Sequence, residues 1–410
     1  MFQVQRIFAV LVITFFAAMG SSAQVSDLRT ISSAEVNAAI EKGLPGFTFP
    51  KATAPIAVKK VVYSTTGTKG ERQNVSGILI LPQKGTSKGL VVYMHGTTWD
   101  FKNAPSRVVH KLKPGSAEPL AFAAAGYAVA MPDYIGLGDS TGYHPYPLNI
   151  VNGRSGVDIV APARNYARRS GYALGDKLFV TGYSEGGGTA MGMVKLIEES
   201  GDASLKITRA APASGPYDLT GVTRDYLLAD VAGDDILIRA FLLGYTISYF
   251  KHDLGVNTDD YFTKTMARTV NANFKRGRSD KMVGLGLVIM GKLSGGTRSR
   301  DHLLTPRFIS ALETLDRSDP VIKYMSENNV HDWAPRTEML LISLATDKVV
   351  DPRNATVAMK NMRRRGVSAH TLRHLEIHND KLEHGTASIQ ATYETLRFFE
   401  NGFAAVPNSK

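Results

Sequence analysis

Short, almost wholly apolar runs recur along most of this chain, separated by polar segments that contain glycine or proline. The runs with strand character span residues 58–63, 75–81, 90–94, 127–131, 178–181, 207–213, 339–345 and 370–377. Segments with apolar residues at helical spacing follow four of them, at residues 157–168, 189–197, 355–364 and 388–399. This alternation predicts the α/β class, with a mostly parallel sheet flanked by helices. The strands are apolar throughout, as expected where both faces of a sheet are covered.

Two stretches depart from this alternation. The first two runs, 58–63 and 75–81, are joined only by a polar, glycine-containing turn, which predicts an antiparallel pair. Residues 216–335 contain helical segments, such as 226–250, and few convincing strands. This stretch is too long for a structureless loop. We therefore predict a helical cap insertion over the edge of the sheet where the parallel strands end.

The N-terminus has the pattern of an export signal. Arg6 precedes an apolar stretch at residues 7–19, and the small residues Ser21, Ser22 and Ala23 follow. This pattern predicts cleavage near Ala23 and a secreted or periplasmic protein, whereas an uncleaved membrane anchor is the alternative. The predicted organisation is a signal peptide at 1–23, a core in two parts at 24–215 and 336–410, and the cap at 216–335.

The composition excludes several kinds of functional site but adds little to the prediction of the fold. Of the 410 residues, 43% are hydrophobic and 21% are charged, which is ordinary globular usage. Length alone would allow two or three domains, but the pattern above predicts one interrupted sheet. There is no cysteine. Disulfide scaffolds, thiolate zinc sites and a cysteine nucleophile are therefore excluded.

The main candidate for chemistry is a serine at a predicted strand-to-helix turn. Ser184 is the centre of a G-x-S-x-G pattern that directly follows the apolar run 178–181. Such a turn lifts the hydroxyl clear of the sheet, and positions two residues away must be small; Gly182 and Gly186 satisfy this. A glycine-rich turn without chemistry is the alternative. The matching strand and helix favour a nucleophile elbow instead.

A serine hydroxyl needs a base to become a nucleophile, and in this architecture the order along the chain is serine, acid, histidine. His384 follows the last predicted strand and precedes the last helix, so we predict that it is the base, on a loop. His378, at the end of that strand, is the alternative. The histidines at 370, 374 and 378 share one strand face, and no zinc motif accompanies them, so no metal is assigned.

The acid should follow the preceding strand. Asp347 is the first carboxylate after the run 339–345, and we predict that it orients the imidazole and stabilises its charged form. Asp351 is the alternative acid, although an aspartate before Pro352 also suits the start of a helix.

A tetrahedral intermediate needs hydrogen-bond donors for its oxyanion. One predicted donor is the backbone N–H of Glu185, the residue after the nucleophile. The second is the N–H of Thr97, in the loop after the run 90–94, where Gly96 allows close approach of the backbone. His95 precedes the serine in the chain, so we assign it to supporting this loop.

Taken together, these segments resemble the α/β-hydrolase superfamily. The resemblance covers residues 93–96, the stretch Asp133–Ser140, the Ser184 turn, the Asp347 segment and His384-Gly385. The stretch from Asp133 to Tyr146 is similar to secreted bacterial lipase/esterase-like members. The resemblance implies hydrolysis of small carboxylic esters through an acyl-serine, without a cofactor, with Ser184, Asp347 and His384 as nucleophile, acid and base. The loop His-Gly-Thr-Thr differs from the triple-glycine form of some lipases, which leaves acyl and alcohol preference open.

Two other functions remain open at this point. A serine peptidase or amidase would use the same residues, and its amine-binding carboxylates could come from the insertion at Asp225, Asp230, Asp234 and Asp235. A non-catalytic binding protein could retain the same scaffold. The apolar stretch 240–250 is either a lid that meets acyl chains or packed helix core.

The charge does not identify a nucleic-acid partner. Forty-eight basic and 37 acidic residues give a net charge of +11. The basic clusters at 275–278, 298–300 and 363–365 belong to no recognised nucleic-acid motif, so we predict none as a partner. Weak association with lipid or anionic envelope surfaces stays open.

Overall fold

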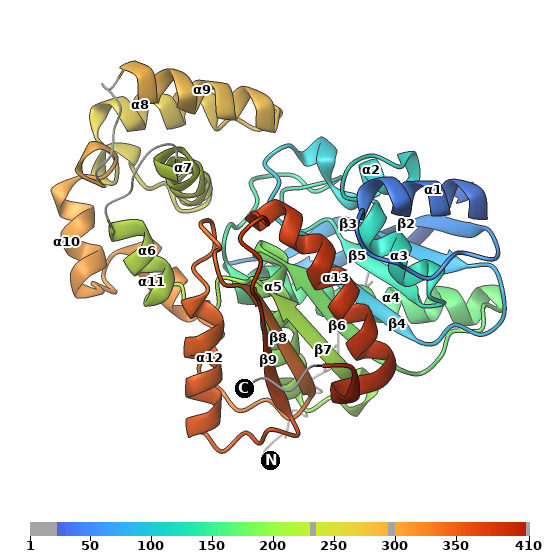
Figure 1. Cartoon of the computed structure of the whole chain (residues 1–410). Helices are drawn as coiled ribbons and strands as arrows, with labels where there is room; N and C mark the ends of the chain where they lie inside the picture. Colours follow the sequence, from blue (N-terminus) through green and yellow to red (C-terminus); the bar gives the residue numbers. More distant parts are fainter. Residues whose placement is uncertain (1–22, 230–234, 294–299, 407–410) are drawn as a thin grey trace, which may run out of the picture.

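A computed structural model describes residues 23–229, 235–293 and 300–406. Within these ranges nine strands form one sheet (Figure 1). They are β1 (Gln24–Ile31), β2 (Ile56–Thr66), β3 (Arg72–Pro82), β4 (Leu90–Met94), β5 (Ala128–Pro132), β6 (Leu178–Tyr183), β7 (Ile207–Ala213), β8 (Glu338–Leu344) and β9 (Leu372–Ile377). The predicted signal peptide lies almost wholly outside the described residues.

The strands lie in the order β1-β2-β3-β5-β4-β6-β7-β8-β9. The pairs β1/β2, β2/β3 and β3/β5 are antiparallel, and the five pairs from β5/β4 to β8/β9 are parallel. The predicted α/β class and mostly parallel sheet are therefore confirmed. Because β4, β6, β7, β8 and β9 all run the same way, their carboxyl ends meet at one edge, where ligands of such sheets bind.

Helices cover both faces of the sheet (Figure 1). They are α1 (Ser33–Gly43), α2 (Pro105–Val108), α3 (Ala117–Ala124), α4 (Asn149–Ser170), α5 (Glu185–Ser200), α12 (Arg353–Arg364) and α13 (His384–Asn401). Buried residues of α1, α3 and α13 form one apolar cluster, and those of α4, α5 and α12 form another. In β4, Val91 belongs to the first cluster and Val92 to the second, because neighbouring side chains point to opposite faces.

Six described helices lie between β7 and β8 and share a third apolar cluster. They are α6 (Val222–Leu228), α7 (Asp235–Leu254), α8 (Lys264–Asn273), α9 (Asp280–Leu293), α10 (Pro306–Thr314) and α11 (Pro320–Glu327). Residues in this segment pair as strands only at the bridge between Phe262 and Leu304, within the described ranges. In Figure 1 these helices lie together beyond one edge of the sheet, where they form the cap.

Strand β1 and helix α1, at the start of the core, were not anticipated from the sequence. Strand β1, with the sequence QVSDLRTI, is mostly exposed and pairs with β2 at the sheet margin, so it has no apolar run. Helix α1 follows it and begins with a capping box, in which Ser32 and Glu35 satisfy each other's backbone N–H groups. Both lie at the start of the core, away from the predicted chemistry.

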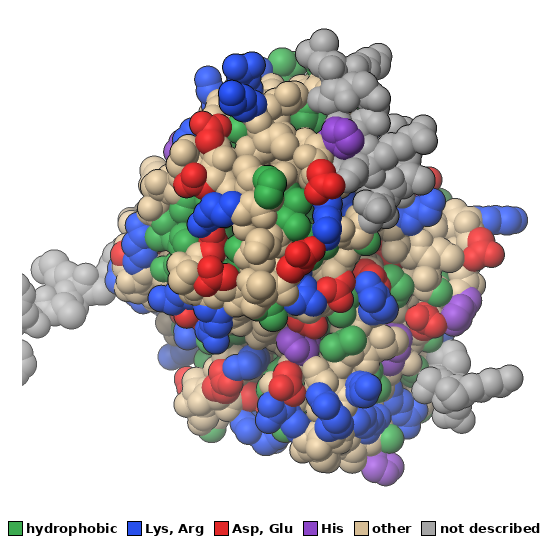
Figure 2. Space-filling view, turned by 90° about the vertical axis from the view of Figure 1, so that its left-hand side faces the viewer, with side chains coloured by type: hydrophobic (Ala, Val, Ile, Leu, Met, Phe, Trp, Pro, Cys, Tyr) green, Lys and Arg blue, Asp and Glu red, His purple; other side chains and the backbone are tan. Residues whose placement is uncertain are grey.

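Charges of both signs alternate over the surface that carries the cap and α12. Figure 2 shows this face, with Lys and Arg side chains interspersed with Asp and Glu. Within the cluster 363–365, the Arg365 guanidinium lies 2.6 Å from the Asp332 carboxylate. Exposed pairs of this kind contribute little to stability.

Among the described residues, no helix has the length and apolar character that crossing a bilayer requires.

Candidate active site

Ser184 occupies a sharp turn between β6 and α5. Its φ of 62° and ψ of −127° are strained for a residue with a side chain. A Cβ atom on Gly182 would lie 2.3 Å from the Gly186 carbonyl oxygen, and one on Gly186 would lie 2.0 Å from that of Met94. Only glycine fits these two positions, because the turn is pressed against the end of β4. The strain at Ser184 is thus maintained by backbone packing on both sides.

The three residues predicted as nucleophile, base and acid form one hydrogen-bonded chain. Nε2 of His384 lies 2.8 Å from Oγ of Ser184, and Nδ1 of His384 lies 2.6 Å from Oδ2 of Asp347. Since a carboxylate only accepts, Nδ1 of His384 carries the proton and Nε2 can accept the proton of the serine hydroxyl. The sequence separations of 200 and 37 residues show that the fold, not local sequence, brings these side chains together.

Asp347 is held rigidly behind the histidine. Its side chain is 1% exposed, and its Oδ1 accepts hydrogen bonds from the backbone N–H groups of Val349 and Val350, at 2.9 and 3.0 Å. One carboxylate oxygen thus binds the loop after β8 while the other binds the imidazole. This arrangement fixes the tautomer and the ring orientation of His384.

His384 differs from its prediction in one respect. We expected it on a loop, but it is the first residue of helix α13. The helix begins there because Glu383 and Thr386 form a capping box, in which each side chain accepts a hydrogen bond from the other residue's backbone N–H. The Glu383 N–H donates to the Thr386 hydroxyl at 2.9 Å. The hydroxyl of Tyr183 donates to the His384 carbonyl oxygen at 2.6 Å, and the two rings lie 5.1 Å apart. Burial raises the pKa of Tyr183, so it stays a donor.

The alternative residues are bound elsewhere. The His378 imidazole is 73% exposed and pairs with Glu376. The Asp351 carboxylate accepts from the backbone N–H and the guanidinium of Arg353, at the start of α12. His374 lies 2.8 Å from the Ser343 hydroxyl. No group of three or more potential ligands that could hold a metal ion occurs among the described residues.

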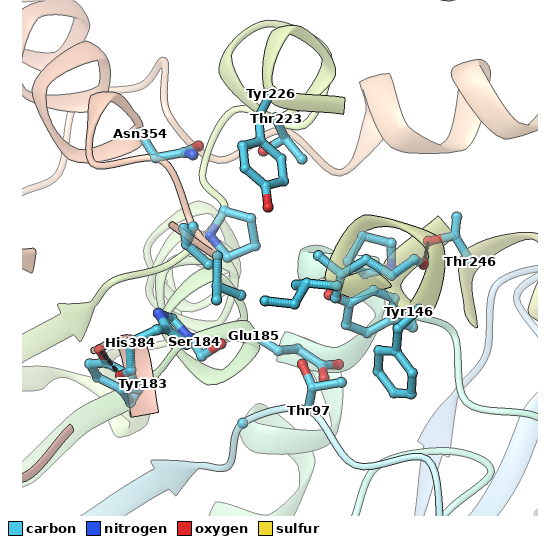
Figure 3. A pocket seen from close by; sticks show the side chains of 18 of the residues that line it. Thr97, Tyr146, Tyr183, Ser184, Glu185, Thr223, Tyr226, Thr246, Asn354 and His384 are labelled. Carbon is cyan, nitrogen blue, oxygen red and sulfur yellow. Dashed lines mark hydrogen bonds between the residues drawn. The ribbon is translucent and has the colours of Figure 1, made fainter. Parts of the chain in front are cut away.

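The loop after β4 lies directly beside the serine turn. A Cβ atom on Gly96 would be 3.3 Å from the Tyr183 carbonyl oxygen and 3.8 Å from Cβ of Ser184. The next residue, Thr97, faces the same cavity as Ser184, Glu185 and His384 (Figure 3). Thr97 and Glu185, whose N–H groups are the predicted oxyanion donors, therefore line the same cavity as the serine.

His95 supports this loop from inside the protein. Nδ1 lies 2.7 Å from the Gly96 carbonyl oxygen and Nε2 lies 3.3 Å from that of Asp133. Its ring stacks on Tyr134 at 4.1 Å. Burial lowers the pKa of His95, which favours the neutral ring.

Glu185 has a second feature that sequence reasoning did not assign. Its carboxylate Oε1 lies 2.5 Å from Nε2 of His144, and both side chains are 1% exposed. Nδ1 of His144 lies 3.1 Å from the Ile135 carbonyl oxygen, and Asn152 donates to Glu185 at 3.4 Å. The residue after the serine is thereby anchored to the loop after β5. In the sequence, His144 was included only within the stretch from Asp133 to Tyr146 that resembles other proteins, and it was given no role.

A cavity of about 440 Å³ lies above the serine and separates it from the cap. Figure 3 shows Ser184, Thr97 and His384 on one side of it and Thr223 and Tyr226 on the opposite side. Most of its walls are aliphatic or aromatic, and the cap lines it with Leu227, Phe241, Leu242, Leu243, Thr246, Ile247, Phe308, Leu312, Val321 and Met325. The stretch 240–250 lies in α7, which packs in the cap's apolar cluster and also lines the cavity.

The chain resembles several solved structures, although no protein-family model and no curated protein sequence matches it. A Legionella pneumophila protein that is described only as a hydrolase has a TM-score of 0.79 at 23% identity, over 94% of this chain and 99% of its own. The rice cell wall degrading esterase LipA from Xanthomonas oryzae has a TM-score of 0.73 at 24% identity, over 93% and 95%. Candida antarctica lipase A has a TM-score of 0.65 at 16% identity, over 94% and 82%. These likenesses show that the chain has the α/β-hydrolase fold.

Proposed function

We propose that this protein hydrolyses carboxylic esters through an acyl-serine intermediate. The observation that carries the proposal is the continuous hydrogen-bonded chain from Ser184 through His384 to Asp347, at the floor of an apolar cavity. A hydroxyl, an imidazole and a buried carboxylate in this order activate the hydroxyl as a nucleophile. The names of two structural neighbours, an esterase and a lipase, agree with this reaction.

The first half of the reaction forms the acyl-enzyme. Nε2 of His384 takes the Ser184 proton while Oγ bonds to the ester carbonyl carbon, and Asp347 stabilises the imidazolium. The carbonyl oxygen becomes an oxyanion that accepts hydrogen bonds from the backbone N–H groups of Glu185 and Thr97. His384 then gives its proton to the leaving alcohol as the ester C–O bond breaks.

The second half repeats these steps with water. His384 takes a proton from a water molecule, the hydroxide oxygen bonds to the acyl carbon, and the second tetrahedral intermediate collapses. Ser184 leaves with the proton returned by His384, and the carboxylic acid is released. The charges balance at each step, so the cycle requires no cofactor.

Two further expectations belong to the same proposal. The N-terminal pattern around Arg6 and Ala23 supports export to the periplasm or the medium.

On α9, Met282, Leu285 and Ile289 expose between 44% and 51% of their surface, beside the exposed Lys281. An apolar stripe next to a cation suits weak contact with an anionic lipid surface.

The peptidase reading gains no support from Asp225, the one of the four predicted carboxylates whose side chain the structure describes. The Asp225 carboxylate is paired with the Arg224 guanidinium at 2.6 Å. Asp230 and Asp234 lie outside the described residues. A parallel assay of p-nitrophenyl esters and aminoacyl-nitroanilides separates the two activities, and we expect hydrolysis of the esters alone.

The decisive variant is Ser184→Ala. We expect purified protein to hydrolyse p-nitrophenyl esters over a panel of acyl lengths, and a fluorophosphonate probe to label it. Replacing Ser184 by alanine should lower kcat by about 10⁴-fold or more and abolish labelling, because the nucleophile is lost. Near-wild-type hydrolysis by this variant would overturn the proposal.

A further inference from the structure

The loop that follows β4 is attached to the cap by a carboxylate. Oδ1 of Asp280, in the first turn of α9, accepts the backbone N–H groups of Trp99 at 2.7 Å and Asp100 at 3.1 Å. Its Oδ2 accepts from the Asn103 side-chain amide at 2.7 Å and from the Thr98 hydroxyl at 3.3 Å. A single side chain of the cap therefore satisfies four donors of this loop.

Two more contacts hold the same loop on the cap. The hydroxyl of Tyr245, on α7, donates to the Thr98 carbonyl oxygen at 2.7 Å. The Trp99 ring is 6% exposed and belongs to the cap's apolar cluster, with ring distances of 4.8 Å to Tyr245 and 5.1 Å to Phe274. The loop is thus continuous with β4 at one end and embedded in the cap at the other.

Thr97 lies between these two attachments. On its core side, Gly96 is packed against the serine turn, and on its cap side, Thr98 and Trp99 are fixed by Tyr245 and Asp280. An oxyanion donor works only if its N–H stands about 2.7–3.1 Å from the oxygen of the intermediate. A shift of the loop by about 1 Å would lose most of that contribution.

The placement of a carboxylate at this position is favourable for α9 as well. Asp280 is the first residue of the helix, where the unpaired N–H groups and the positive end of the helix dipole stabilise an anion. The charge therefore serves both the helix start and the loop, and charge-assisted bonds to backbone N–H groups are stronger than neutral ones.

We propose that Asp280 is a positioning residue for ester hydrolysis: from the cap, it holds the Thr97 N–H in the position where it stabilises the oxyanion. This inference rests on the proposed function of the Ser184 site. It follows that displacement of α9 from the loop would weaken the second oxyanion donor. The cap then contributes to the chemical step and not only to the wall of the cavity.

The test compares Asp280→Ala with a matched cap variant, Asp316→Ala. Asp316 is exposed, and its carboxylate accepts the Ser318 N–H at 2.9 Å without touching the core. We expect Asp280→Ala to lower kcat by about 30- to 100-fold, less than complete loss of an oxyanion donor, with KM nearly unchanged. The inhibition constant of an alkyl boronic acid, whose adduct with Ser184 places an oxygen at the oxyanion site, should rise by a similar factor. Asp316→Ala should change neither.

Two other variants keep the test decisive if Asp280→Ala does not fold. Tyr245→Phe removes only the hydroxyl that binds the Thr98 carbonyl oxygen, and it should lower kcat by about three- to tenfold. Asp280→Asn keeps an amide oxygen for the two backbone N–H groups, so it should recover most of the activity lost in Asp280→Ala. This rescue separates the acceptor function from a general loosening of the cap.

The outcomes distinguish the inference from the proposed function. If wild-type protein neither hydrolyses esters nor reacts with a fluorophosphonate, the proposed function fails, and the inference fails with it. If wild-type protein is active but Asp280→Ala keeps kcat and boronic-acid affinity within about twofold, only the inference is overturned. A fall in melting temperature without a change in kcat would also overturn it, because Asp280 would then be structural alone.

Discussion

The edge of the sheet is held by close packing of backbone against backbone, whereas the cap is held by packing of side chains. At the edge, backbone meets backbone: Gly182 and Gly186 leave no room for a Cβ atom, and Ser184 is held at a positive φ. In the cap, helices meet through side chains, and α9 leaves Leu285 51% exposed. The edge therefore tolerates almost no change in shape, whereas exposed positions of the cap such as Leu285 can be substituted more freely. Asp280 belongs to the cap but holds a loop at the edge.

The largest expected effect comes from the edge. Asp347→Asn should lower kcat by about 10⁴-fold with little change in KM, because an amide next to Nδ1 favours the wrong tautomer of His384. The matched control is Asp380→Asn, an exposed aspartate on the loop between β9 and α13. Steady-state kinetics on both variants checks this. Retention of a tenth of the wild-type kcat in Asp347→Asn would contradict the role given to the carboxylate.

The next largest effect should come from the buried pair of Glu185 and His144, which anchors the residue after the serine. Glu185→Leu leaves His144 and Asn152 without their partner, so we expect kcat to fall by about 100-fold and unfolding to be easier by about 2 kcal/mol. Glu185→Gln keeps a side chain of the same shape that can hydrogen-bond to His144, and it should stay within about tenfold of wild type. Equal losses in the two variants would show that charge, and not the hydrogen bond, is required.

A smaller effect should come from the cavity wall. Leu242, on α7, lines the cavity, and Leu242→Trp should reduce its volume. We expect kcat/KM for long-chain esters to fall by about tenfold through steric exclusion, while acetate esters change little. Leu315→Trp is the control, since Leu315 is a partly exposed cap residue outside the cavity lining. A uniform loss for all acyl lengths would mean that this wall does not select the acyl chain.

The smallest effect should come from a cap position far from the edge. Thr305 accepts the Phe308 N–H at 3.2 Å and caps α10. Thr305→Ala should lower the free energy of unfolding by about 1 kcal/mol and leave kcat within about twofold. Urea denaturation and kinetics on the same preparation measure both. A large loss of kcat would show that even a cap position distant from the sheet edge affects activity.

The same contrast explains what could be predicted from the sequence. The chain from Ser184 to Asp347 was predictable because each residue follows an apolar strand, and parallel strands bring their ends to one edge. His384 was predicted in the right region, but its place at the start of α13 depends on a cap by Glu383, which is not a typical capping residue. Strand β1 was missed because it is polar and marginal.

The contacts that hold the site were not predictable. Asp280 and Trp99 are 181 residues apart, and Glu185 and His144 are separated by 41. No local pattern marks either pair, since an aspartate at a helix start and a histidine before a proline are common on their own. Their roles depend on how the cap and the loops after β4 and β5 pack, which only the three-dimensional structure specifies.

The central claim is that Ser184 becomes covalently acylated. Its most direct test is to mix the protein with a p-nitrophenyl ester, stop the reaction with acid during turnover, and measure the mass of the protein and its peptides. We predict a mass increase equal to one acyl group, located on the peptide that contains Ser184 and absent from Ser184→Ala. Steady hydrolysis of the ester without any acyl adduct on Ser184, under conditions where deacylation is slow, would contradict the account.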